Sequence, residues 1–186
     1  MKRYGSVCVA PSRIHGEGTF AAVDIGAGER IFAVDDSNVV PEGVDLEEIE
    51  REHRHHCDDI AGGKKVILGE PDGCINHCCD PNLVRKTEAG VRYEISLRDI
   101  SAGEELTHDY CINGGGDTVW ECNCGSARCR GTIHSDFFHL PPALQLEYLP
   151  LLDDWFVEEN RERVEALRAQ DSDYLPNLNR DSLTAD

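Results

Sequence analysis

The amino-acid sequence predicts a mainly β fold with short helices and a helical tail at the C-terminus. In the first third of the chain, short apolar segments are separated by glycine-containing turns, a pattern typical of β-strands. The stretch VRYEISL alternates between apolar and polar residues, as a strand with two different faces does. After Ser135, by contrast, apolar residues recur at helical spacing.

The expected strands begin with SVCVA, GTFAA and ERIFAV between residues 6 and 34, separated by the turns HGEG and GAG. Residues 41–60 are charged and weakly amphipathic, so we expect a short exposed helix there. KKVILG and ELTHDY are further extended segments, and INGGGD is a flexible loop. The apolar residues that share one face of VRYEISL are Val91, Tyr93, Ile95 and Leu97.

The tail after Ser135 is predicted to form two helices. Pro142 suits the first turn of a helix, and Pro150 suits a break between two helices. We expect the apolar stripe of this tail to pack against the domain rather than bind a separate partner, and about the last fifteen residues to be frayed. The stripe consists of Leu144, Tyr148, Leu151, Leu152, Trp155 and Phe156.

Length and cysteine content narrow the class of protein. The chain has 186 residues, enough for one domain with appendages and a buried core. It has no run of about 18 apolar residues that could span a membrane, and its N-terminus lacks the apolar run of a secretory signal. Nine cysteines then indicate a reducing compartment, with thiols that are free or metal-bound. We therefore expect an intracellular protein, cytoplasmic or, if its source is a eukaryote, nuclear.

The net charge of −18 argues against direct binding to nucleic acid, because phosphate contacts need clustered Lys and Arg. A cationic protein or peptide is a better partner, since an acidic field steers it toward the surface. The alternative is that the charge only keeps the protein in solution, and composition by itself favours this second interpretation.

Three cysteines, Cys122, Cys124 and Cys129, form the strongest chemical signal in the sequence. Their segment has few apolar side chains, so the three thiols cannot all belong to a hydrophobic core. A tetrahedral zinc site needs four nitrogen or sulfur ligands, so a fourth must come from elsewhere in the chain. Free exposed thiols are disfavoured because they are poorly tolerated. Candidates for the fourth ligand are nearby histidines and Cys57, Cys78, Cys79 and Cys111.

The sequence HRHHC at residues 53–57 is a second candidate metal site. It lies within the charged segment expected to form an exposed helix, and Arg54 stands among the candidate ligands. We therefore favour a solvated helix face over a metal site for this cluster.

Four stretches resemble the motifs of SET-domain protein lysine methyltransferases, in that family's order. SRIHGEGTFAAVDIGAGERI resembles the N-terminal Gly-x-Gly segment, and INHCCDPN resembles the Asn-His-Ser-Cys-x-Pro-Asn motif. GEELTHDY resembles the Gly-Glu-Glu-Leu-Thr-aromatic-Asp-Tyr motif, and CNCGSARCRG resembles the post-SET zinc segment. The stretches extend from residue 12 to about residue 133. Each is weak alone, but the four together are very specific.

The resemblance implies the SET fold, in which small curved β-sheets surround a pseudoknot. It implies a SET domain at residues 5–111 with a variable insert at 36–72, a post-SET zinc segment at 120–133, and a C-terminal helical extension at 134–186. Members of the family transfer a methyl group from S-adenosylmethionine to a lysine side chain. We expect this activity here, on a basic protein such as a histone, a histone-like protein or a ribosomal protein.

The resemblance also implies roles for individual residues. Tyr110 matches the catalytic tyrosine, and Cys78 stands where the family has serine and is assigned to local packing or a weak hydrogen bond, not to metal. One structural zinc is expected, held by Cys79, Cys122, Cys124 and Cys129. Glycine lets the main chain approach a ligand closely, because it has no Cβ. The residues implied in cofactor binding are Gly16, Glu17, Gly18, Asn76, His77 and Tyr110.

His108 is the main departure from the family pattern, which has Phe or Tyr at this position. The residue there influences how many methyl groups are added, so His108 marks a product-specificity position and leaves the number open. Because imidazole titrates near neutral pH, we expect the activity to depend on pH through His108. The alternative function is a catalytically weak SET-fold module that binds a peptide or protein partner. Retention of Asn76, His77 and Tyr110 favours the enzyme.

Overall fold

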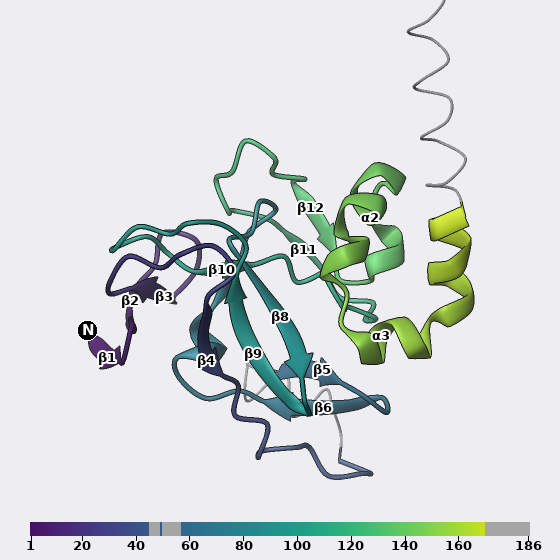
Figure 1. Cartoon of the computed structure of the whole chain (residues 1–186), viewed down its shortest axis with the longest axis horizontal. Helices are drawn as coiled ribbons and strands as arrows, with labels where there is room; N and C mark the ends of the chain where they lie inside the picture. Colours follow the sequence, from purple (N-terminus) through teal and green to yellow (C-terminus); the bar gives the residue numbers. More distant parts are fainter. Residues whose placement is uncertain (45–48, 50–56, 170–186) are drawn as a thin grey trace, which may run out of the picture.

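The structure is a computed structural model that describes residues 1–44, 49 and 57–169 (Figure 1). Small β-sheets make up most of the regular structure, and short helices follow them, as the sequence predicts. Within the described residues, the strands form two three-stranded sheets and three two-stranded pairs. The C-terminal helices lie together on one side of the sheets (Figure 1).

The N-terminal sheet is antiparallel and has β2 (Val7–Pro11) between β1 (Lys2–Tyr4) and β3 (Glu17–Ala21). The turn that leads into β3 includes Gly16 at a φ of 48°, a left-handed conformation that favours glycine. The strands predicted from SVCVA and GTFAA are confirmed. β1 was not predicted, because its three residues are polar or half-buried and have no apolar alternation.

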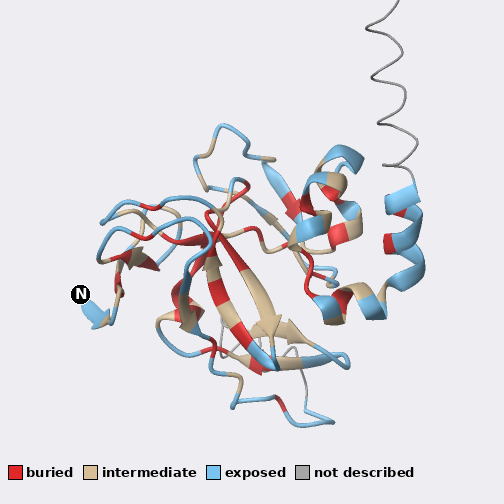
Figure 2. Cartoon of the chain, in the orientation of Figure 1, coloured by how far each residue is buried: buried red, intermediate tan, exposed pale blue. Residues whose placement is uncertain are grey.

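The second sheet has the order β4 (Arg30–Ala33), β9 (Val91–Ser96) and β8 (Leu83–Glu88), all antiparallel. The alternation predicted for VRYEISL is confirmed, but the deeply buried face of β9 is its polar one (Figure 2). Val91 is 39% exposed, whereas Glu94 is fully buried. The charged side chains of the polar face can be buried because each of them pairs with side chains from other elements.

A two-stranded pair of β5 (Cys57–Ile60) and β6 (Lys64–Ile67) follows the undescribed segment. The strand predicted from KKVILG is confirmed. The helix expected over residues 41–60 is wrong for residues 57–60, which pair with β6, and residues 41–44 form a turn. Local polarity suggested a helix there, but pairing with β6 decides the structure. Residues 53–56 of HRHHC lie outside the described residues, so their assignment stays a prediction.

Two short segments far apart in the sequence meet in the centre of the molecule. β7 (Asn76–His77) follows the one-turn helix η1 (Asp72–Cys74) and pairs in parallel with β10 (Thr107–His108). Asn82 stabilises this crossing: its Oδ1 accepts a hydrogen bond from the Thr107 amide at 2.8 Å, and its Nδ2 donates to the Glu105 carbonyl. The segment ELTHDY is thus extended for only two residues of regular strand.

The C-terminal part begins with an antiparallel pair of β11 (Val119–Glu121) and β12 (Thr132–His134). The short helices that follow are η2 (Phe137–His139), α2 (Pro142–Tyr148), η3 (Leu149–Leu151) and α3 (Asp154–Glu159), and residues 161–169 are also helical. Pro142 is at the start of α2, and Pro150 is within η3, between the two α-helices, as predicted. The frayed end expected for the tail lies outside the described residues.

The predicted apolar stripe of the tail packs against the domain, which confirms the expectation. Tyr148, Leu152 and Phe156 are buried in one cluster with Cys79 and Cys111, and Leu144, Leu151 and Trp155 pack against it. Figure 2 shows buried positions on the helices where they face the rest of the chain. No helix among the described residues is both long and apolar enough to cross a membrane.

Phe137→Ala is expected to lower the free energy of unfolding by about 3–5 kcal/mol, as for other large aromatic truncations in a core. Phe137 is fully buried, and its ring contacts those of Phe138 and Phe156 at centroid distances of 5.1 and 5.7 Å. Chemical denaturation monitored by circular dichroism measures the change. The control Val23→Ala, at a 42% exposed position, should stay within about 0.5 kcal/mol of wild type.

Candidate active site and metal cluster

A cavity of about 640 Å³ lies where β7 and β10 meet. Its volume is within the range of small-molecule and cofactor pockets. Its wall includes three of the predicted site residues from the crossing strands and one from the turn that follows, and the C-terminal part adds aromatic side chains. Residues of the wall include His15, Asp72, Asn76, His77, Arg85, His108, Tyr110, Trp120 and Trp155.

Asn76 connects the crossing strands to the N-terminal Gly-x-Gly segment. Its Nδ2 donates to the carbonyl oxygens of His15 and Glu17, at 3.2 and 3.0 Å, and to Glu105 Oε1 at 2.8 Å. The amide has two hydrogens, so these three acceptors share them. The side-chain NH₂ is therefore engaged within the protein, which leaves the side-chain oxygen Oδ1 of Asn76 for a ligand.

His77 connects the cavity wall to the cysteine cluster. Its Nδ1 accepts a hydrogen bond from the Tyr110 amide at 3.1 Å, so Nε2 carries the hydrogen and lies 3.3 Å from Cys79 Sγ. Burial lowers the pKa of His77 to about 4, so the ring is neutral at physiological pH. The ring packs edge-on against those of Tyr110 and Trp120, at centroid distances of 5.3 and 5.5 Å.

Tyr110 presents its phenol to the cavity. The hydroxyl donates to the Ile75 carbonyl at 2.7 Å, so its lone pairs remain for a second partner. Burial raises the pKa of Tyr110 above its ordinary value, so the hydroxyl stays protonated and uncharged. An oriented, neutral phenol can position a nucleophile and stabilise developing positive charge, but it is not a base at neutral pH.

Asp109 lies between His108 and Tyr110 in sequence and points away from them. Arg130 binds both of its carboxylate oxygens, and the Tyr148 hydroxyl donates to Oδ2 at 3.2 Å. Burial by itself would raise the pKa of Asp109, but Arg130 outweighs it and holds the pKa below its ordinary value. This buried ion pair attaches the segment after the cysteines, and α2, to the centre of the molecule. These roles were not predicted from the sequence, although Arg130 is the arginine of the CNCGSARCRG match.

His108 also lies on the cavity wall, and its role as a product-specificity position stays a prediction. Its Nε2 is 2.6 Å from Glu94 Oε2 of β9, and Arg85 Nε of β8 donates to Glu94 Oε1 at 2.7 Å. Arg85 in turn pairs with Asp58 and Asp72. This network was not predicted from the sequence, because Glu94 is on the face of VRYEISL that alternation assigns to solvent.

Of the expected cofactor residues, Gly16 lies in the turn before β3 and Glu17 and Gly18 begin this strand, next to Ile14 and His15 of the cavity wall. A Cβ on Gly18 would lie 2.9 Å from Ser12 Cβ and collide with the Glu105 carboxylate. Packing therefore already accounts for glycine at this position. The role of these three residues in binding a cofactor stays a prediction.

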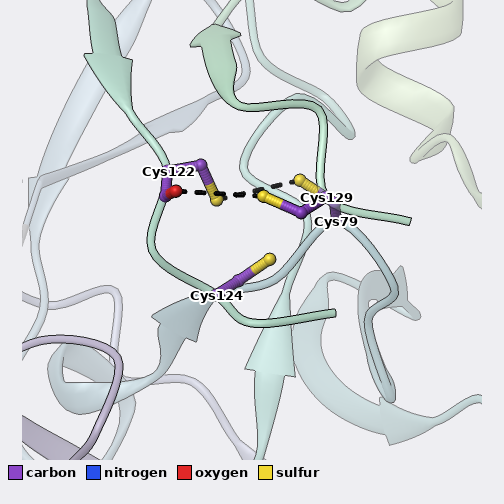
Figure 3. A group of neighbouring side chains, drawn as sticks. All are labelled: Cys79, Cys122, Cys124 and Cys129. Atoms are coloured by element: carbon purple, nitrogen blue, oxygen red, sulfur yellow. Dashed lines mark hydrogen bonds between the residues drawn. The ribbon is translucent and has the colours of Figure 1, made fainter. Parts of the chain in front are cut away.

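Four thiols form one cluster: Cys79, Cys122, Cys124 and Cys129 (Figure 3). Their sulfur atoms all lie within 4.8 Å of one another, and the Sγ atoms of Cys79 and Cys122 are 3.8 Å apart. Zinc held at about 2.3 Å by four thiolates requires sulfur separations of about 3.8 Å. The four cysteines therefore fit a tetrahedral zinc ion, and the cluster joins Cys79 of the Asn-His motif to the segment of Cys122 to Cys129.

The other cysteines considered as ligands lie outside this cluster. Cys78 is buried beside Cys79, where its sulfur accepts a hydrogen bond from the Asp80 amide at 3.5 Å. Cys111 is fully buried and its thiol donates to the His134 carbonyl at 3.0 Å. Cys57 is on β5, next to Asp58 of the charge network. Among the described residues, the four-thiol group thus contains Cys79 and none of these three.

Residues 16–111 match the model of the SET domain family. The chain belongs to the SET domain family. Three similar relatives are the trithorax histone-lysine N-methyltransferase of Drosophila melanogaster, the H3 lysine-4 specific enzyme of Saccharomyces cerevisiae and histone-lysine N-methyltransferase 2B of Homo sapiens. Their identities to this SET chain are 34%, 33% and 32%, over 67%, 72% and 67% of it.

The SET chain spans only a small part of these relatives, namely 4%, 14% and 5% of their lengths. A chain in the crystal structure of an active polycomb repressive complex 2 in the basal state is also similar. Its TM-score is 0.48 at 29% identity, over 57% of this chain and 15% of that one. Family membership rests on the sequence matches, which include the residues of the crossing strands.

Gly18→Ala in this SET domain is expected to lower the free energy of unfolding by about 1–3 kcal/mol, as overpacking does. The new Cβ must displace the Glu105 carboxylate, which also holds Asn76. Gly69→Ala is the matched control, since a Cβ on Gly69 would have no neighbouring atom within 4 Å. It should change stability by about 1 kcal/mol or less. Equal denaturation midpoints for the two variants would contradict the packing role assigned to Gly18.

Proposed function

We propose that this SET domain transfers a methyl group from S-adenosylmethionine to a lysine side chain of a basic protein. The observation that carries the proposal is the position of Tyr110. Its protonated hydroxyl is fixed on the Ile75 carbonyl at the wall of a cavity of cofactor size, beside Asn76 and His77. The three motif residues on which a SET methyltransferase depends are thus assembled around one cavity rather than dispersed.

Methyl transfer requires mainly that the protein align the lysine nitrogen with the methyl group of the cofactor. S-adenosylmethionine, when bound, supplies a methyl group on a positively charged sulfur. Asn76 Oδ1 and the main chain around Gly16 and His77 are the groups that we expect to hold it, at the cavity wall. Tyr110 orients the lysine nitrogen through its hydroxyl oxygen, and Trp120 packs behind Tyr110 at a ring distance of 6.0 Å. Such positioning supplies much of the rate of a transfer between two bound groups.

The substrate class follows from charge and from the relatives. A net charge of −18 attracts a lysine-rich segment. The three relatives named above are histone-lysine methyltransferases, and one is specific for lysine 4 of histone H3. We therefore place a histone or a similarly basic protein first among substrates, which implies a nuclear location if the source is a eukaryote.

We also propose one structural zinc ion, held by Cys79, Cys122, Cys124 and Cys129. The support is the donor set itself, because four thiols within 4.8 Å of one another match a closed tetrahedral site. The ion would attach the segment of Cys122 to Cys129 beside His77, and so beside the cavity. Arg130, next to this segment, reinforces the attachment through Asp109.

The first prediction of this proposal concerns activity. The protein is incubated with labelled S-adenosylmethionine and a panel of histones, ribosomal proteins and acidic control proteins. A basic protein should become labelled on lysine, and mass spectrometry can locate the labelled residue. Tyr110→Phe should lower kcat by about 10²-fold or more while cofactor binding, measured by calorimetry, stays near wild type. Absence of labelling with intact cofactor binding would favour the binding-module alternative.

The second prediction concerns zinc. Elemental analysis of the purified protein should find one zinc ion per chain. Cys79→Ser should lose it and unfold at a lower temperature, because the apo segment has little core of its own. Cys78→Ser is the matched control at the adjacent position and should keep the ion. The reverse pattern, with zinc lost only from Cys78→Ser, would show that the ligand is assigned to the wrong cysteine.

A further inference from the structure

The imidazole of His108 and the carboxylate of Glu94 form a buried pair in the cavity wall. β10 carries His108, β9 carries Glu94, and Nε2 and Oε2 are 2.6 Å apart. Glu94 has no exposed surface, although glutamate is almost never fully buried unless it is paired. A carboxylate buried at the centre of a sheet, and aimed at a wall residue, therefore requires an explanation beyond stability.

Glu94 is held in its ionised form by its surroundings. Burial by itself would raise the pKa of Glu94, but Arg85 and His108 outweigh it and hold the pKa well below its ordinary range. Arg85 donates to Oε1 and His108 lies at Oε2, so both carboxylate oxygens are engaged. A carboxylate in this position accepts a hydrogen bond, so Nε2 of His108 carries the hydrogen.

The hydrogen bond to Glu94 determines the state of the other ring nitrogen of His108, Nδ1. With Nε2–H on Glu94, Nδ1 of His108 has a free lone pair, and it makes no hydrogen bond to any of the described residues. His108 and Tyr110 both line the cavity, whereas the side chain between them, Asp109, points to Arg130. A proton acceptor and the phenol proposed to orient the lysine thus share one wall.

We propose that His108, oriented by Glu94, accepts the proton of the substrate lysine ammonium before methyl transfer. This inference rests on the proposed function. The ammonium N–H bond breaks and an Nδ1–H bond forms, which gives a neutral amine and an imidazolium paired with Glu94. The amine then takes the methyl group, and the imidazolium returns its proton to water through the open cavity. His108 is the catalytic base, and Glu94 is a positioning residue that acts through it.

The charges around His108 favour this proton transfer. Glu94 of β9 contacts it and His77 of β7 lies opposite it in the strand pair, and the same cavity is lined by Arg85 of β8, Arg92 of β9, Asp58 of β5 and Asp72 of η1. Two of these groups are cations, because Arg92 also pairs with Asp58, and three are carboxyl groups. Burial raises the pKa of Asp72, so this carboxyl adds less negative charge than the others. Glu94 is the carboxylate in direct contact with the ring, and this contact stabilises an imidazolium.

A phenylalanine or tyrosine at this position would act differently. Neither has a basic lone pair at neutral pH, so the lysine, with an ordinary pKa of about 10.4, must lose its proton to water first. The rate then rises tenfold for each pH unit until the lysine is deprotonated. With His108 as acceptor, the rate should instead level off at a lower pH, because the proton then passes to the ring and not to water.

Two substitutions separate basicity from packing. His108→Gln keeps an amide that can donate to Glu94 but has no basic nitrogen, and His108→Phe removes the hydrogen bond as well. The profile of kcat against pH, from about pH 6 to about pH 10, is measured on a lysine peptide at saturating S-adenosylmethionine. Wild type should reach a plateau within this range, whereas both variants should rise with a slope of one throughout it and be about 10²-fold slower at about pH 7.5. Mass spectrometry of the product records the number of methyl groups in parallel.

Glu94→Gln tests the positioning residue and Glu94→Asp is its conservative partner. Glu94→Gln should lower the rate at neutral pH and move the plateau, and Glu94→Asp should restore part of the wild-type profile. If loss of the Arg85 partner prevents Glu94→Gln from folding, as thermal unfolding would show, His108→Gln alone decides the inference. Profiles of wild type and His108→Gln that superimpose overturn it.

The same measurements distinguish failure of the inference from failure of the proposed function. Wild type that binds S-adenosylmethionine but methylates no basic protein overturns the proposed methyl transfer and the role of His108 with it. If wild type is active but its rate rises with a slope of one against pH throughout the range, the proposed methyl transfer stands and only the role of His108 as a base is overturned. Calorimetry with S-adenosylmethionine on each variant confirms that the cavity is intact.

Discussion

The parallel pairing of β7 with β10 holds the whole site together. Asn76 lies opposite Thr107 and His77 opposite His108, so two motifs distant in sequence share one short pair of strands. The Tyr110 amide donates to His77, and the Cys78 amide donates to the His108 carbonyl at 2.6 Å. A pairing of two residues is weak in isolation. It is stabilised here because the Asn82 side chain hydrogen-bonds to the main chain of Glu105 and Thr107, and because the neighbouring Leu106 is fully buried.

From this crossing, side chains leave in two directions. His108 and Tyr110 line the cavity, while Asp109 and Cys79 join the C-terminal part through Arg130 and the cysteine cluster. The alternation of a short extended segment makes this division possible, because neighbouring side chains point to opposite sides. The same few residues therefore contribute to both the cavity and the cysteine cluster. His77 lies between the two: its ring accepts a hydrogen bond from the Tyr110 amide and is close to the Cys79 sulfur.

The buried face of β9 shows how tertiary structure overrides a local pattern. The alternation of apolar and polar residues in VRYEISL correctly predicts a strand, but the face that is buried is the one with Arg92 and Glu94. Arg92 pairs with Asp36 and Asp58, and Glu94 pairs with Arg85 and His108. β8, with the sequence LVRKTE, was missed for the same reason, since its half-buried Arg85 is held by ion pairs and not by apolar contacts. A buried charge is stable only beside its partner, and partners distant in sequence leave no periodic signal.

The class of structure and the inventory of chemistry could be predicted from the sequence: short strands between glycine turns, a tail that packs through an apolar stripe, and motif residues for methyl transfer and zinc. Periodicity and turn chemistry are local properties, so a single sequence carries them. Two other features required the folded chain: residues 57–60 form a strand, and Glu94 lies behind His108. Each of these depends on which distant segments pair, because hydrogen bonds, ion pairs and metal ligands are set by distances in space and not by spacing along the chain.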